Sequence, residues 1–174
     1  MHIMIDLETM GNRPNAPIIA IGAVAFDANG IDRELYEVVD LDSSVRSGAV
    51  IDPHTVMWWL QQSDEARASL VAMDGVTLSK ALDKFSLWAT VSDITGVWGN
   101  GAAFDNVILA ESYRRLDKVA PWPFWKDKCY RTVKGMYPDV KMERGGTHHN
   151  ALDDARSQAL HLIQMNETIY GKVL

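Results

Sequence analysis

The chain has 174 residues, of which 47% are hydrophobic and 23% are charged, as in an ordinary globular protein. Its single cysteine, Cys129, excludes an internal disulfide framework and a cysteine-rich zinc site, and it suits a reducing compartment. The formal net charge is −6, and no apolar run approaches the roughly 20 residues of a membrane helix. At this length we expect one domain over residues 1–174, and because Met1 leads directly into a short strand we expect no leader. With the single cysteine and no long apolar run, we also expect a cytoplasmic location and no membrane partner.

The first apolar segment carries two acids at alternate positions. Residues 3–8 read Ile-Met-Ile-Asp-Leu-Glu, and on a β-strand this spacing places Asp6 and Glu8 on one face. Two adjacent carboxylates repel each other unless a cation lies between them, and Mg²⁺ and Mn²⁺ prefer oxygen ligands. The alternative is an exposed strand end. The turn residues from Thr9 to Pro14 favour a site, because they place the pair at the carboxyl end of a strand.

Three strands are predicted near the start of the chain. The first is followed by a near-continuous apolar run from Pro17 to Phe26, which ends in a turn that contains Asn29 and Gly30. The alternating segment from Glu34 to Leu41 completes an antiparallel meander, and residues 43–52 are expected to be a loop.

Helical segments are predicted next, over Pro53–Gln62, Asp64–Met73 and Thr77–Val91. The last of these has apolar residues at helical spacing and Thr77 as its N-cap.

A fourth strand, Thr95–Trp98, is predicted before a helix over residues 102–116. Asp105 falls in the first turn of that helix, where the helix dipole alone favours a carboxylate. If the fourth strand lies beside the first, it delivers Asp105 to the site of Asp6 and Glu8, and Phe104 anchors the helix in the core.

Basic residues are concentrated between Lys126 and Arg144. This segment holds six basic residues and three acids, so its net charge is +3 and that of the remainder is −9. A short helix over Cys129–Tyr137 and a loop over residues 138–147 are predicted within it. The basic segment is compatible with a phosphodiester substrate or with a solvated helix and loop.

The last candidate cluster lies at the start of a long closing helix from Ala151 to the end of the chain. Asn150 is expected to be the N-cap, which gives Asp153 a structural role near the first turn. Helical angles do not separate Asp153 from Asp154. A histidine just before the helix has a side chain whose ordinary pKa suits proton abstraction near neutrality. The elements together predict a mixed α/β sheet, three antiparallel strands followed by parallel strands, flanked by helices.

These segments resemble the three exonuclease motifs of the DEDDh family, which has a ribonuclease-H-like fold. The motifs are Asp6-Leu7-Glu8, Asn100 with Phe104-Asp105, and residues 149–154, which read His-Asn-Ala-Leu-Asp-Asp. The family spacing of a His and an Asp five positions later is met by His149 with Asp154 and by His148 with Asp153. The context Ala-Leu-x-Asp-Ala favours the first pair. Residues 9–11 and 55–60 further resemble a bacterial and phage 3′ exoribonuclease-like branch related to ribonuclease T, in which relatives are often labelled exodeoxyribonuclease.

The resemblance implies a metal-dependent 3′-to-5′ exonuclease that releases nucleoside 5′-monophosphates from single-stranded RNA or DNA. It implies two Mg²⁺ or Mn²⁺ ions held by four acids, with a histidine as the general base. The implied metal ligands are Asp6, Glu8, Asp105 and Asp154, and the implied base is His149. Side chains near them are candidates to bind substrate: Thr9, Met10, Trp58, Trp59, Asn100 and Phe104. Aromatic members could stack on bases, although core packing is favoured for Phe104 and for one of the tryptophans.

Two other functions are compatible with the sequence. One is an oligoribonuclease-like phosphodiesterase for very short oligonucleotides, and the other is a nucleic-acid-binding domain with weak catalysis. The sequence leaves open the choice between RNA and DNA, the pathway, and whether the protein is a homodimer, as many relatives of the ribonuclease T type are.

Overall fold

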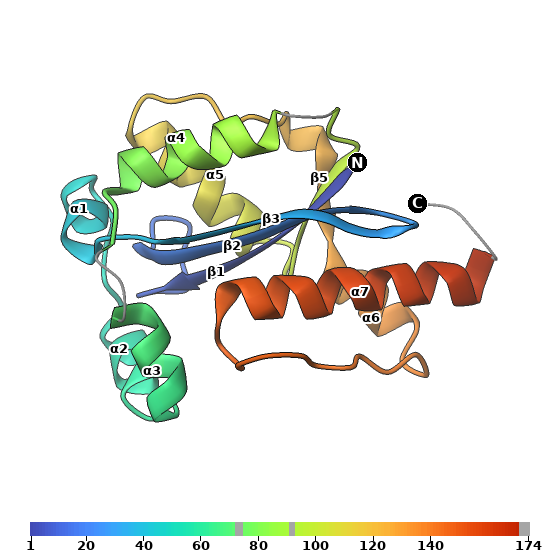
Figure 1. The fold of residues 1–174 in the computed structure, drawn as a ribbon. Helices are drawn as coiled ribbons and strands as arrows, with labels where there is room; N and C mark the ends of the chain where they lie inside the picture. The colour runs from blue at the N-terminus through green and yellow to red at the C-terminus, as the bar shows by residue number, and fades with distance from the viewer. Residues whose placement is uncertain (72–74, 91–92, 171–174) are drawn as a thin grey trace.

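The computed structural model describes residues 1–71, 75–90 and 93–170, and it is built on one mixed sheet (Figure 1). The strand order is β3-β2-β1-β4-β5, and β1 pairs antiparallel with β2 and parallel with β4. The strands are β1 (His2–Thr9), β2 (Ile18–Asp27), β3 (Gly30–Val38), β4 (Gly96–Gly99) and β5 (Asp127–Cys129). The predicted α/β fold, with a meander followed by parallel strands, is therefore confirmed.

Helices cover both faces of the sheet. Figure 1 shows α4 (Leu78–Ala89) and α5 (Asp105–Arg115) on one face, and α6 (Tyr130–Met136) and α7 (Ala151–Tyr170) on the other. Short helices occupy the connections: α1 (Leu41–Arg46), α2 (Pro53–Trp59), α3 (Asp64–Val71) and the 3-10 helix η1 (Phe124–Lys126). Over the described residues, no helix is both long and apolar enough to cross a membrane.

The central strand β1 separates two hydrophobic cores. Ile3, Ile5 and Leu7 pack in the core beneath α4 and α5, whereas Met4 packs in the core beneath α6 and α7. The alternation of the strand therefore directs Asp6 and Glu8 to the same face as Met4, as the sequence predicts, and the structure shows that α7 covers this face.

Glycine is required in β2 where α7 begins. Gly22 pairs with Asp6 in the strand register, and a Cβ atom added to Gly22 would lie 2.1 Å from the carbonyl carbon of Ala151. The first residue of α7 therefore rests on the backbone of β2. This close approach places the first turn of α7 beside the end of β1.

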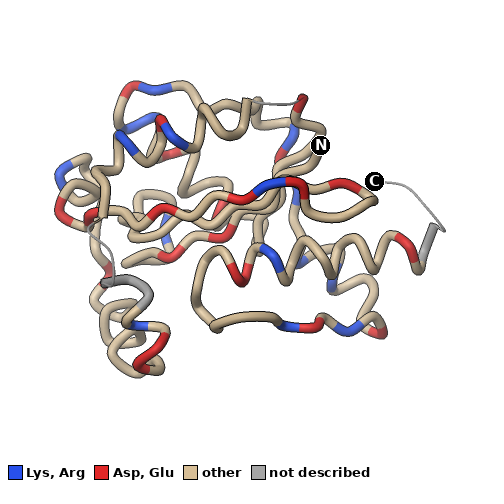
Figure 2. The backbone as a smooth tube through the Cα atoms, viewed as in Figure 1, with Lys and Arg blue, Asp and Glu red and all other residues tan. Residues whose placement is uncertain are grey.

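The loop from α6 back to α7 runs along the edge of this second layer. Basic and acidic residues alternate along it, with Asp139, Lys141, Glu143 and Arg144 (Figure 2). A buried network holds it in place, in which the hydroxyl of Tyr130 lies 2.7 Å from Nδ1 of His161 and Nε2 of His161 lies 2.9 Å from the carbonyl oxygen of Val140.

Some elements differ from the sequence predictions. Helix α1 occupies part of the predicted loop over residues 43–52, because the carboxylate of Asp40 caps it by accepting from the backbone N–H groups of Asp42 and Ser43. Strand β5 was not predicted, since three residues carry no periodicity. Helix α5 begins at Asp105 rather than at residue 102.

The predicted ends of three helices at Met73, Val91 and Leu174 lie outside the described residues.

We expect Gly22→Ala to destabilise the protein by about 1–3 kcal/mol, because a Cβ atom at this position overlaps the α7 backbone and forces the helix away. Gly135→Ala in α6 is a matched control, since its added Cβ meets nothing within 4 Å and alanine is the better helix former. Urea denaturation measures both free energies of unfolding. Equal stability of Gly22→Ala and wild type would contradict the proposed seating of α7.

Candidate active site

A cavity of about 430 Å³ lies at the carboxyl end of β1, between α2, the start of α5 and the start of α7. Most of the residues that the sequence singled out line it. These are Asp6, Glu8, Thr9, Trp58, Trp59, Asn100, Phe104, Asp105, His148, His149 and Asp154.

Three carboxylates meet in this cavity. Asp6 and Glu8 come from β1 and Asp154 from the first turn of α7, and each offers an oxygen within 4.8 Å of the others. Glu8 is buried, with 6% of its surface exposed. The arrangement concentrates negative charge where little water reaches it.

Asp105 is placed differently from these three acids. Its carboxylate is buried and accepts hydrogen bonds from the backbone N–H groups of Leu7 at 3.1 Å and Asn100 at 2.7 Å. It therefore ties the end of β1 to the loop after β4, as the predicted pairing of the two strands requires. Its oxygens lie outside the group that Asp6, Glu8 and Asp154 form.

The electrostatics of the cavity disfavour four charged carboxylates without a cation. Burial raises the pKa of Glu8 to about 9, with further contributions from the charges of Asp154 and Asp105. Burial and the neighbouring carboxylates also raise the pKa of Asp6 well above its ordinary value. Burial raises the pKa of Asp105 to about 6, although its backbone hydrogen bonds oppose this shift.

The residues present fit a divalent cation. Oε1 of Glu8 is buried and lacks a hydrogen-bond partner in the described part of the chain, so it is free to accept a ligand bond. The other donors are carboxylate oxygens, which Mg²⁺ and Mn²⁺ prefer. One positive charge already reaches the group, because Nη1 of Arg144 lies 2.6 Å from Oδ1 of Asp154.

Asp154 and Asp153 have separate roles in the structure. Asp154 accepts a hydrogen bond from the backbone N–H of His149 at 3.0 Å and faces the cavity. Asp153 instead accepts from the backbone N–H of Thr147 and from Arg156, which anchors the preceding loop. Asn150 caps the helix through hydrogen bonds from the N–H groups of residues 152 and 153, as predicted. The structure thus brings Asp154, and not Asp153, to Asp6 and Glu8.

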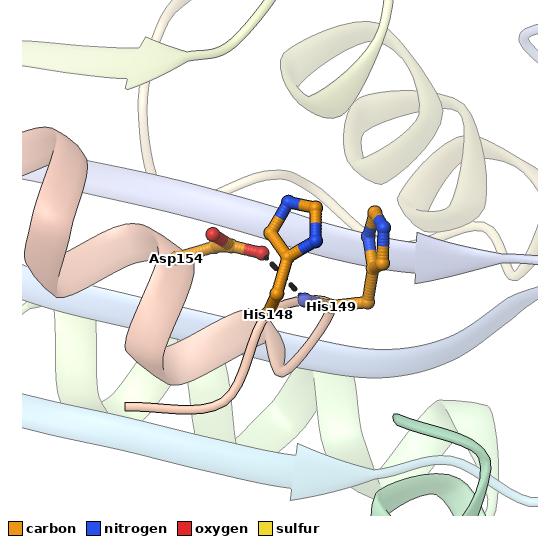
Figure 3. Close-up of side chains that lie close together, drawn as sticks. All are labelled: His148, His149 and Asp154. Atoms are coloured by element: carbon orange, nitrogen blue, oxygen red, sulfur yellow. Dashed lines mark hydrogen bonds between the residues drawn. The ribbon is translucent and has the colours of Figure 1, made fainter. Parts of the chain in front are cut away.

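The two histidines lie side by side at the start of α7 (Figure 3). Their ring centroids are 3.8 Å apart, and each offers a nitrogen within 4.8 Å of the other and of a carboxylate oxygen of Asp154. They differ in their surroundings. His148 is exposed, whereas the ring of His149 packs edge-on against Trp58 and Trp59, with centroids at 4.9 and 6.1 Å.

The backbone and the pKa of His149 are both unusual. Its φ angle of 62° is in the left-handed region, which residues other than glycine rarely adopt. Burial and the charge of His148 lower its pKa, against an opposing effect of Asp154. The lowered pKa favours the neutral imidazole of His149 near pH 7.

The aromatic candidates divide between the cavity and the core. Trp59 is buried and donates a hydrogen bond from Nε1 to the carbonyl oxygen of Thr9 at 3.0 Å, whereas Trp58 is 41% exposed. Phe104 lines the cavity and also packs against the core.

Met10 packs beside Trp59 and does not line the cavity. Met10 lies one residue beyond the end of β1 at Thr9, in the predicted turn, so the alternation that places Asp6 and Glu8 on one face no longer sets its direction.

Gln158, which contacts one of the predicted acids in the cavity, was missed in the sequence. Nε2 of Gln158 donates a hydrogen bond to Oδ1 of Asp6 at 2.7 Å, and its buried Oε1 has no partner among the described residues. Gln158 follows Asp154 by four residues, which is one helical turn, so helical spacing from Asp154 would have identified it. Arg131 and Arg144, which also line the cavity, belong to the basic segment that the sequence showed.

The acids at the end of the central strand and the histidine at the start of the closing helix come from the three segments that resemble the DEDDh exonuclease motifs. The chain belongs to the family described as the 3′-5′ exoribonuclease Rv2179c-like domain, whose model matches residues 1–165. The protein is therefore a 3′-to-5′ exonuclease of the DEDDh type. It is also similar to the exodeoxyribonuclease of Enterobacteria phage T4, with 27% identity over 156 residues that cover 74% of this chain and 68% of that protein.

Solved structures share the fold. The nuclease domain of 3′hExo bound to rAMP has a TM-score of 0.63 at 18% identity, covering 96% of this chain and 92% of that one. Exonuclease X in complex with 5′ overhanging duplex DNA has a TM-score of 0.62 at 19% identity, covering 99% of this chain and 95% of that one. Both likenesses confirm the ribonuclease-H-like fold.

Proposed function

We propose that the protein removes nucleotides from the 3′ end of single-stranded RNA or DNA and releases nucleoside 5′-monophosphates, with two divalent cations as cofactors. The observation that carries this proposal is the meeting of Asp6, Glu8 and Asp154 within 4.8 Å, with a buried oxygen of Glu8 that has no other partner in the described chain.

The acids supply the ligands for the cations. Asp6, Glu8 and Asp154 hold them, with Asp105 alongside at the junction of β1 and the loop after β4. When bound, Mg²⁺ or Mn²⁺ lowers the pKa of a coordinated water and neutralises charge on the phosphate and the leaving oxygen. Gln158 orients Asp6 through its hydrogen bond.

His149 is the general base in this proposal. It accepts a proton from the attacking water, for which a neutral imidazole is required. Its lowered pKa favours the neutral form, and T-shaped contacts with the rings of Trp58 and Trp59 position its ring near Asp154.

The 3′-terminal nucleotide binds against the aromatic wall of the cavity. Trp58 is exposed there and Phe104 lies beside Asp105, so both present ring surface to a base. Thr9 and Asn100 line the same cavity and carry groups that hydrogen-bond to a sugar or phosphate. Substrates of both sugar types are proposed, since the family description refers to RNA and the name of the phage relative refers to DNA.

The experiment that tests the reaction uses 5′-labelled single-stranded RNA and DNA of one sequence, incubated with Mg²⁺ or Mn²⁺. We expect a ladder that shortens from the 3′ end, lost with EDTA and reduced about a thousandfold or more in Asp6→Asn and Asp154→Asn, because each removes an anionic ligand. Asp153→Asn is the matched control and should lose far less activity than Asp154→Asn, since Asp153 faces Thr147 and Arg156 and does not line the cavity. Substantial cleavage by Asp154→Asn would refute the ligand assignment.

We expect His149→Ala to lower kcat by about 10² to 10⁴-fold, the usual effect of removing a general base. His148→Ala should lose far less, because its exposed ring makes no contact with Trp58 or Trp59 that would position it. Single-turnover rates on one labelled oligonucleotide give the comparison. A larger loss in His148→Ala would mean that the neighbouring histidine is the base.

A further inference from the structure

A second hollow adjoins the cavity of the carboxylates. It has a volume of about 640 Å³ and lies between α6 and the loop that leads from α6 to α7. Asn100, Arg131 and Arg144 line both hollows, so the second is continuous with the first. We call it the basic groove.

The charge of the groove is entirely positive. Arg131 and Lys134 reach it from α6, and Lys141 and Arg144 reach it from the loop, whereas Asp139 and Glu143 of the same loop are not among its lining residues. Both lysines are exposed, and in the described part of the chain neither forms an ion pair. Lys141 donates to the carbonyl oxygen of Pro138 at 2.7 Å, and Nζ of Lys134 lies 6.0 Å from the ring centroid of Tyr130.

One wall of the basic groove, formed by the loop from α6 to α7, is held in place by a buried hydrogen-bond network. Tyr130 and His161 are 1% and 2% exposed, and they fix the loop through Val140 and through a contact of the Tyr130 hydroxyl with Sδ of Met142 at 3.3 Å. Val140 and Met142 line the groove directly. The backbone that carries Lys141 and Arg144 is therefore held in place by buried contacts of its neighbours Val140 and Met142.

A strand degraded from its 3′ end must leave the active-site cavity toward its 5′ side. A third hollow, next to residues 11–15 and 50–54, also adjoins the cavity, but its charged lining consists of Arg13 and Asp52, which offset each other. The basic groove is the exit whose charge matches a phosphodiester backbone.

We propose that the basic groove binds the backbone phosphates of the substrate strand on the 5′ side of the nucleotide being removed. This inference rests on the proposed function and extends it. Phosphate binding in the basic groove would make the enzyme selective for strands longer than a dinucleotide. Lys134 and Lys141 contact phosphates there. Arg131 and Arg144 extend the same line of charge into the carboxylate cavity.

The test measures binding without catalysis. A fluorescein-labelled single-stranded decamer and the matching dinucleotide, as DNA and as RNA, are titrated with the full chain in EDTA at several salt concentrations, and anisotropy gives the affinity. Each phosphate contact on a single strand contributes about 0.7 to the slope of log K against log salt. For the decamers, Lys134→Gln/Lys141→Gln should reduce this slope by about 1.4 and weaken binding, so that raising salt from 50 to 200 mM lowers wild-type affinity about sevenfold more than that of the variant. The dinucleotides should bind both proteins alike.

The matched control is Lys80→Gln/Lys84→Gln, which makes the same change of charge on α4, on the opposite face of the sheet. It should leave the slope unchanged, and each single groove variant should reduce it by about 0.7. An unchanged slope in the groove variant, or an equal change in the control, would overturn the proposal. Displacement by a glutamate decamer as effective as by unlabelled oligonucleotide would also overturn it, because the groove would then select acidic peptides equally.

The outcome separates this inference from the proposed function. A groove-dependent slope without any shortening when Mg²⁺ or Mn²⁺ is added would support the groove and contradict the exonuclease reaction on that substrate. Shortening with an unchanged slope would support the reaction and contradict the groove.

Discussion

The repulsion among buried carboxylates is the constraint on which the site depends. Asp6, Glu8 and Asp154 lie within 4.8 Å of one another, and burial raises the pKa of Glu8 to about 9. Without a cation, some of these carboxylates must be protonated to lie so close together. An arrangement so unfavourable for anions is explained if divalent cations replace those protons, and the proposed chemistry follows from the same electrostatics.

Close packing of the scaffold imposes this proximity. Gly22 lets the start of α7 rest on β2 directly opposite Asp6, and Asp105 ties β1 to the loop after β4 through two backbone hydrogen bonds. Elements that are distant in sequence therefore converge on one end of β1. The same α7 layer carries the His161 and Tyr130 network, which positions the loop of Lys141 and Arg144. Catalytic cavity and basic groove are thus two parts of one packed layer.

The periodicity of apolar residues in the sequence was sufficient to predict the main strands and helices. Alternation along residues 3–8 correctly placed Asp6 and Glu8 on one face, and the apolar run of β2 marked a buried strand. Periodicity was insufficient where contacts between distant residues, or a single capping side chain, determine the backbone conformation. Three-residue β5 is fixed by hydrogen bonds to Asp127 from Asn106 and Trp122, and α1 depends on its Asp40 cap. The shift in the pairing register of β1 and β2 between Glu8 and Thr9 also has no local signal in the sequence.

The choice between Asp153 and Asp154 also needed the structure as well as the sequence. Spacing allowed His148 with Asp153 as well as His149 with Asp154, and only the structure shows that Asp153 is bound by Thr147 and Arg156. Gln158 was recognisable once Asp154 was placed, because it lies one turn later on the same face. The groove needed the structure, since Lys134 and Lys141 come together only when the loop folds back along α6.

The most direct test of the central claim is calorimetric titration of Mn²⁺ into metal-free protein at pH 7.5, in two buffers with different ionisation enthalpies. With a pKa of about 9, Glu8 is largely protonated at this pH and must lose its proton to bind a cation. We therefore predict proton release on binding, an affinity that rises with pH up to about pH 9, and a marked loss of both in Glu8→Gln. Absence of binding, or binding without proton release, would contradict the account.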